Sequence, residues 1–189
     1  LGSSTEGNLP LKTTPTDAGV LCLRFPRSGA SDKSESFLGF VRRLSKAYGG
    51  DLLEKDSTRS LVIFRGAGRG LSMVQCAMSL LDLANRESIE VSAGLAHGMI
   101  AFRNTGTSSA FYNIGTTLHK NSIFGASIDT AIRLADTAKN GEALIPSHLS
   151  RFYEYGKYSI KNTQTVWVPE VQRLETVSYT HLRAHETRE

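Results

Sequence analysis

The sequence predicts one α+β domain of the βαββαβ type with an extra C-terminal hairpin. Its 189 residues are enough for one full core and too few for two comfortable ones. With 40% apolar and 21% charged residues, the composition is that of an ordinary globular protein. Apolar runs of strand length alternate with segments whose apolar residues recur at helical spacing. Together these observations predict mixed strands and helices around one core.

Both ends of the chain lack such periodicity. Residues 1–18 are rich in Gly, Ser, Thr and Pro and predict a flexible leader or linker, and the start without a methionine indicates a fragment. We expect residues 173–189 to be a non-native or disordered tail, because the chain from Ser178 on resembles translated vector sequence. Three residues of this tail therefore receive no weight as metal ligands: His181, His185 and Glu186. The predicted domain spans residues 19–172.

The first half of the domain reads strand, helix, hairpin. Residues 19–25 form an apolar run suited to a central strand. Apolar residues at helical spacing predict a helix over 34–48, which Gly49 and Gly50 stop. Residues 51–55 and 60–64 then predict the two strands of a hairpin.

A helix and a long strand follow. The apolar stripe of residues 69–85 predicts the helix. Residues 90–102 predict the strand, in which Gly94 and Gly98 mark a bulge or a close backbone approach. The Gly/Ser/Thr-rich residues 104–120 predict a loop or extended arm.

The last part of the domain repeats the pattern in shorter form. A helix is predicted over 125–139, closed by Asn140-Gly141. A short strand at 143–145, a turn of helix and a hairpin at about 157–171 complete the domain. Two βαβ-type units around an antiparallel hairpin predict a ferredoxin-like sheet with its helices on one face.

Charge and cysteine content narrow the function classes. The net charge is +4, without the Lys/Arg run of a nucleic-acid-binding arm, so only a weak preference for anions follows. Cys22 and Cys76 lie in apolar segments and are expected to be buried and reduced, as in an intracellular protein. Phe25 and Phe64 are the aromatics of the central strands and are expected in the core, which disfavours an RNA-recognition domain. No apolar run approaches the roughly 20 residues of a membrane span.

Four segments resemble the catalytic domain of class III nucleotide cyclases in order and spacing: GVLCLRF, YGGDLLEKDSTRSLVIF, VSAGLAHGMI and SIFGASIDTAIRLADTAKNGEALIPSHL. The last match is the most specific, and its matching positions are Gly125, Ala131, Arg133, Leu134, Ala138, Gly141 and Leu144. The resemblance covers roughly residues 19–171. It implies a sheet of nucleotide cyclase type and a head-to-tail dimer with nucleotide sites at the interface. In that family one partner supplies two metal-binding aspartates, and the other supplies base-reading residues and a phosphate-binding lysine.

The two metal positions of the family carry no carboxylate here. The first falls at Arg24, whose guanidinium repels a cation, and the second falls at Thr58, a poor Mg²⁺ anchor. Asp56 lies two residues before Thr58 and offers one carboxylate if the turn shifts, which is still short of a two-metal site. No cofactor is therefore expected for the chain alone, and Mg²⁺ or Mn²⁺ is expected only if a partner's aspartates hold it.

The nucleotide-binding positions are partly kept. The base-reading lysine falls at Glu54, the second base-reading position at Ser122 and the asparagine at Asp129. The arginine is present as Arg133, and Lys161 matches the phosphate lysine. Arg133 and Lys161 are the catalytic candidates, and they are expected to act only when a partner chain completes the site.

Each of these residues also has a purely structural interpretation. Asp129 and Arg133 are four residues apart and suit a solvated helix ion pair. Arg24 suits a cap for a neighbouring carboxylate, and Lys161 suits an ordinary surface lysine. His97 is expected to be a packed or strand-edge histidine.

Two functions remain open from the sequence. The first is a cyclase-homology domain that is inactive alone, a pseudoenzyme that acts in dimerisation or regulation. Metal-independent binding of ATP or GTP through Arg24, Arg133 and Lys161 stays open for this domain. The second is the non-metal half of a heterodimeric adenylate or guanylate cyclase. Either is expected in the cytoplasm, or as the cytosolic part of a larger membrane-attached protein, with a homodimeric or heterodimeric cyclase-type partner and no nucleic acid.

Overall fold

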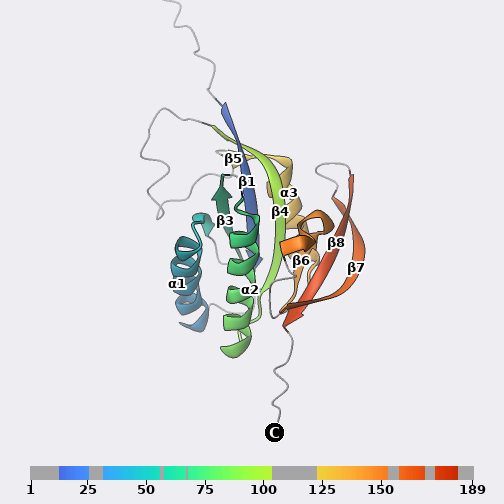
Figure 1. Cartoon of the computed structure of the whole chain (residues 1–189). Coiled ribbons are helices and arrows are strands. Elements are labelled where there is room, and N and C mark those ends of the chain that lie inside the picture. Colours follow the sequence, from blue (N-terminus) through green and yellow to red (C-terminus); the bar gives the residue numbers. More distant parts are fainter. Residues whose placement is uncertain are drawn as a thin grey trace, which may run out of the picture.

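The computed structural model describes residues 13–25, 32–55, 58–66, 68–103, 123–152, 158–168 and 173–182. They form one sheet with helices packed against it (Figure 1). The strands are β1 Thr13–Arg24, β2 Asp51–Lys55, β3 Arg59–Arg65, β4 Ser92–Arg103, β5 Ile123–Phe124, β6 Ala143–Pro146, β7 Tyr158–Val168 and β8 Arg173–Leu182. The helices are α1 Asp32–Ala47, α2 Gly70–Arg86 and α3 Ala126–Thr137, with a 3₁₀ helix η2 Ser147–Phe152.

The strand order confirms the predicted α+β fold. The sheet runs β2-β3-β1-β4-β6-β8-β7, with β5 paired to β4. The β4–β6 pair is parallel and the other described pairs are antiparallel. The first six elements, β1 to β4 with α1 and α2, make the predicted βαββαβ unit with β1 at its centre.

The expectation that all helices share one face of the sheet is wrong for α3. Alternate residues of β1 point to opposite faces. Leu21 and Leu23 join the core with α1 and α2, whereas Val20 and Cys22 join a second core with α3. The central strand is therefore apolar on both faces because each face is covered by helix.

Gly94 on β4 shows how closely α3 approaches the sheet. A Cβ atom at this position would lie 2.2 Å from the carbonyl oxygen of Ala131 and 2.3 Å from the backbone nitrogen of Ala135. Only glycine leaves room for the helix backbone there. The predicted close backbone approach is confirmed at Gly94, and it fixes α3 against β1 and β4.

The sheet extends further at both ends than the sequence predicted. Strand β1 begins at Thr13 rather than at residue 19, because its first residues continue the ladder with β4 as far as Thr13↔Arg103. Strand β8, Arg173–Leu182, lies between β6 and β7, where we expected a tail from residue 173. Threonine, valine and tyrosine in β8 favour a strand through side-chain shape without an apolar alternation.

Other expectations agree with the structure. Cys22 and Cys76 are buried and form no disulfide with one another. The side chains of Phe25 and Phe64 are 7% and 0% exposed, which places both in the core. No helix in the described ranges is long and apolar enough to cross a membrane. The predicted arm at 104–120 lies outside the described residues.

Candidate functional site

Arg24 ends β1 and lies beneath the last turn of α3. Its Nε donates to the carbonyl oxygen of Ala135 at 3.2 Å and to Oγ of Ser92 at 3.1 Å. The Ser92 hydroxyl donates to the same carbonyl at 2.8 Å. The last four carbonyls of a helix have no partner within the helix, and they form the negative end of its dipole. Arg24 is thus a cationic cap for α3, and the acceptor is a helix carbonyl rather than the carboxylate that the sequence suggested.

A second guanidinium lies beside the first. Arg59 on β3 pairs directly with Arg24 in the β1–β3 ladder. Its Nη2 lies 2.7 Å from Oδ2 of Asp136 on α3, in a pair whose side chains are about one-third exposed. Thr58 precedes Arg59, and its carbonyl oxygen accepts a hydrogen bond from the backbone N–H of Phe25 at 2.7 Å. The fold therefore brings Arg24 and Thr58, the two positions at which the resembled family has metal ligands, together at one end of β1 and β3.

The described residues at this end of the sheet do not suit a pair of divalent cations. Mg²⁺ and Mn²⁺ require several oxygen ligands, mainly carboxylates. Two guanidinium groups occupy the site instead, and Asp136 is held by Arg59. Within the described ranges no group of three or more His, Cys, Asp or Glu side chains is arranged to hold a metal ion. Asp56, the alternative carboxylate, lies outside the described residues.

The predicted nucleotide-binding residues are distributed over the domain. Asp129 and Arg133 lie one turn apart on α3, and both are half-buried. Glu54 lies on β2 opposite Leu61, just after a shift in strand register. Lys161 lies on β7 at a second register shift, and Ser122 lies outside the described residues.

Arg24 and Lys161 do not meet within one chain. Strand β7 forms the opposite edge of the sheet, and β4, β6 and β8 lie between it and β1. Four strand spacings separate the two strands by roughly 19 Å. A site that used both residues would have to combine them from two copies, as the family resemblance implies.

Sequence reasoning missed the residues that fix Arg24 and Arg59 in place. Ser92 and Ala135 are 68 and 111 residues from Arg24 along the chain, and Asp136 is 77 residues from Arg59. Only Arg59 carried a signal, since it directly follows the Thr58 position on the predicted hairpin. His97, expected as a packed histidine, is half-buried on β4, with Nε2 3.5 Å from Oδ2 of Asp17.

Solved structures of nucleotide cyclases share this fold. The adenylyl cyclase CyaB from P. aeruginosa is 15% identical, with a TM-score of 0.70 over 94% of this chain and 98% of that one. The guanylyl cyclase Cya2 is 16% identical, with a TM-score of 0.68 over 93% and 96%. The guanylate cyclase domain of RhGC from Catenaria anguillulae, solved with GTP, is 16% identical, with a TM-score of 0.63 over 90% and 100%.

These likenesses establish the fold of a nucleotide cyclase catalytic domain over about nine-tenths of the chain. No protein-family model and no curated protein matches the sequence. At such low identity the likeness concerns the fold, and function has to be argued from the site itself.

Proposed function

We propose that this chain is a cyclase-homology domain of a cytoplasmic signalling protein that makes no cyclic nucleotide alone and acts through dimerisation and regulation. The observation that carries the proposal is the Arg24 guanidinium, bound to the carbonyl of Ala135 at the position where the family places a metal ligand. Arg59 adds a second positive charge beside it. Catalysis by two metals requires ligands that hold the ions and stabilise the developing charge, and these two side chains do the opposite.

The proposed partner is another cyclase-type domain, either a second copy or a different chain. The guanylyl cyclase domain of the RhoGC fusion protein from Blastocladiella emersonii, which matches 92% of this chain at 16% identity, has been solved as a non-canonical dimer and also as a monomer. The separation of Arg24 from Lys161 supports a site divided between partners.

Metal-independent nucleotide binding is the second part of the proposal. A guanidinium carries five N–H donors in a planar fork that suits phosphate oxygens. Both side-chain hydrogen bonds that Arg24 makes to described residues use Nε, and the other four donors belong to Nη1 and Nη2. We propose that Arg24 contacts phosphate directly, with Arg133 and Lys161 supplied by the partner.

Nucleotide titration with and without Mn²⁺ tests the proposal. We expect ATP or GTP to bind equally in both conditions, and Arg24→Gln to weaken that binding. Arg42→Gln, on the exposed face of α1, is the matched control and should bind as the unmodified chain does. Substantial cyclic AMP or GMP from the purified chain with Mn²⁺ would refute the proposal.

A mixing experiment distinguishes this proposal from the alternative, the non-metal half of a heterodimeric cyclase. Cyclase activity that appears with a metal-competent cyclase domain, and disappears with Arg133→Ala, would assign the chain to the non-metal half of a heterodimeric enzyme. Because the titration and the mixing have different readouts, each part of the proposal can fail separately.

A further inference from the structure

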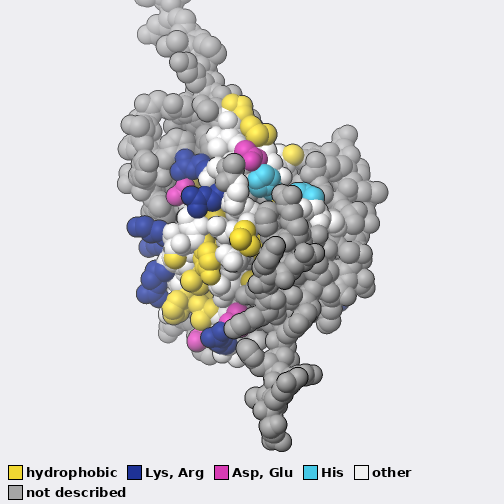
Figure 2. Space-filling view, viewed as in Figure 1, with side chains coloured by type: hydrophobic (Ala, Val, Ile, Leu, Met, Phe, Trp, Pro, Cys, Tyr) yellow, Lys and Arg dark blue, Asp and Glu magenta, His cyan; other side chains and the backbone are white. Residues whose placement is uncertain are grey.

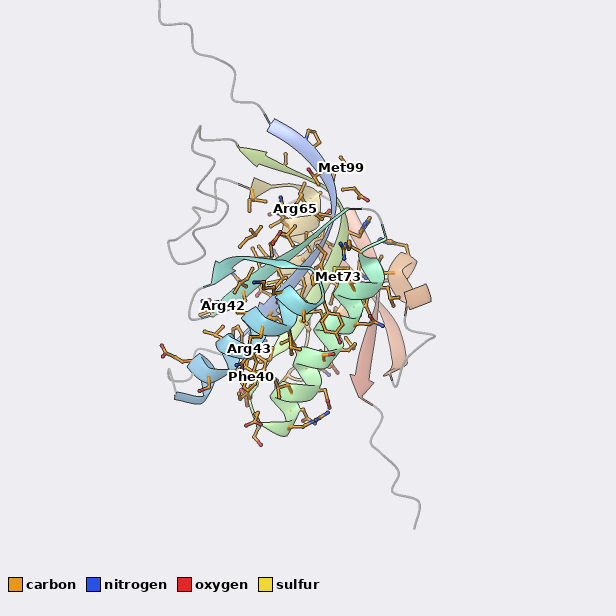
Figure 3. All side chains as sticks on the ribbon, turned by 60° about the vertical axis from the view of Figure 1, so that its left-hand side comes forward. Phe40, Arg42, Arg43, Arg65, Met73 and Met99 are labelled. Atoms are coloured by element: carbon orange, nitrogen blue, oxygen red, sulfur yellow. The ribbon has the colours of Figure 1, made fainter. Side chains whose placement is uncertain are left out.

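The exposed face of α1 carries charged residues before and after a glycine, Gly39. Phe37 and Val41 bury one side of the helix in the core. The other side of the helix carries one stripe of residues at the helical spacing i, i+4, i+7 and i+11. These residues are Glu35, Gly39, Arg42 and Lys46. All four are exposed. Figure 2 shows Lys and Arg side chains along the α1 side of the molecule, and Figure 3 shows Arg42 and Arg43 on this helix.

Gly39 has no internal reason to be glycine. A Cβ at this position would meet no heavy atom within 4 Å, and Gly39 is not among the glycines with positive φ. Glycine in an exposed helix interior destabilises the helix relative to alanine. It does allow another backbone to approach closely, as small residues do where helices cross.

The charges around Gly39 are self-complementary. An antiparallel second copy of α1, crossing at Gly39, sets position 35 of one helix opposite position 43 of the other. Glu35 of one copy then lies beside Arg43 of its partner, with Arg42 next to it, and the two-fold axis repeats the pair. We infer that α1 packs antiparallel against α1 of a second copy of this chain, with the two Gly39 residues at the crossing.

Two details support this arrangement. The guanidinium of Arg43 stacks on the ring of Phe40 at 4.7 Å, which holds the charge on the helix surface (Figure 3). A glutamate early in the helix and basic residues late in it would also stabilise a lone helix through its dipole. That effect leaves Gly39 unexplained, because a helix selected for its own stability would carry alanine there.

This surface is distinct from the proposed nucleotide-binding dimer. Helix α1 packs on the face of the sheet opposite α3, at whose last turn Arg24 lies. The α1 contact goes beyond the proposed function and could join copies or dimers through a second interface. A single helix pair buries little area, so the association is weak and is strongest at low salt.

Charge reversal with rescue tests the inference by sedimentation velocity over a range of protein concentrations. Glu35→Arg and Arg43→Glu should each weaken self-association by about tenfold or more, since both symmetric pairs become repulsive. The double variant, and an equal mixture of the two single variants, should restore it. Gly39→Leu should weaken association while thermal unfolding shows a fold at least as stable. Glu87→Arg, an exposed charge reversal at the end of α2, is the matched control.

The results separate this contact from the other interface. A head-to-tail dimer on the α3 face alone would be insensitive to Glu35→Arg, Arg43→Glu and Gly39→Leu, and that insensitivity would overturn the inference. A double variant as weak as either single variant would also overturn it, as would a chain that stays monomeric at every concentration. Rescue by the double variant and by the mixture supports it, whatever the nucleotide titration shows.

Discussion

Replacing Arg24 by methionine removes the Nε donor and keeps an unbranched side chain of similar reach. The lost interactions are the hydrogen bonds to Ala135 and Ser92. A hydrogen bond from a charged donor contributes about 1.5–3 kcal/mol, but the carbonyl of Ala135 keeps its bond from the Ser92 hydroxyl. We therefore expect Arg24→Met to lower the free energy of unfolding by about 1–2 kcal/mol.

The same carbonyl predicts non-additivity. Ser92→Ala alone should cost about 1 kcal/mol, because Arg24 still serves the carbonyl. In the double variant neither side chain serves it, and an unsatisfied helix carbonyl adds about 1–3 kcal/mol. We expect a total of about 4 kcal/mol, with about 1–2 kcal/mol of coupling between the two sites.

Urea unfolding of the four proteins at one pH measures both quantities. Arg42→Met, the same substitution at an exposed position of α1, should change stability by less than about 0.5 kcal/mol. Single effects that add to within about 0.5 kcal/mol would show that Arg24 and Ser92 do not share the support of α3. If Arg24→Met had the same free energy of unfolding as the unmodified chain, Arg24 would not stabilise α3 as a cap.

Further measurements test other features. Gly94→Ala should cost about 3 kcal/mol or more in urea unfolding, because its Cβ would meet the α3 backbone. Gly39→Ala, where the Cβ would meet open space, should instead gain about 0.5–1 kcal/mol at low protein concentration. Equal effects of the two substitutions would contradict the close approach of α3 at Gly94. Burial raises the pKa of Cys76 to about 12 against 9.0 for an open thiol, so stability should fall by up to about 1.4 kcal/mol per pH unit from pH 9 to pH 12 as the unfolded thiol ionises. In Cys76→Ala the unfolding free energy should fall less steeply with pH over this range. A slope equal to that of the unmodified chain would show that the Cys76 thiol does not contribute to it. Arg24→Asp alone should bind no Mn²⁺ in calorimetry, because Arg59 and Thr58 remain. Clear Mn²⁺ binding would show that one carboxylate at position 24 is enough for a metal site.

The sequence predicted most elements of the sheet because their apolar periods are strong. The helices begin and end within two residues of the expected positions, and Gly49 has the positive φ of 77° that suits a helix stop. Strand β8 and the first residues of β1 were missed because threonine-rich segments pair through backbone hydrogen bonds without an apolar alternation. We did not predict that α3 lies on the second face of the sheet. The sequence did indicate it, because β1 is apolar on both of its faces and each apolar face needs a cover.

The site was less readable than the fold. The resemblance assigned the family's two metal positions to Arg24 and to Thr58 on the hairpin turn. In the structure these residues lie at neighbouring ends of β1 and β3. It could not reveal what Arg24 does, because Ser92 and Ala135 belong to distant segments that meet only when α3 packs on β4. A pattern of residue types tells which group is missing from a site, and only the packed structure tells what the replacement supports.

The cap on α3 also limits how position 24 can change over evolutionary time. A mutation there removes the hydrogen bonds that support α3, and under the proposed function it also removes the phosphate contact of the same guanidinium. A lineage in which a carboxylate replaced Arg24 would lose this support of α3. Unless other residues first strengthened the fold, each intermediate sequence would be less stable than its parent, and loss of the cationic cap would be removed by selection.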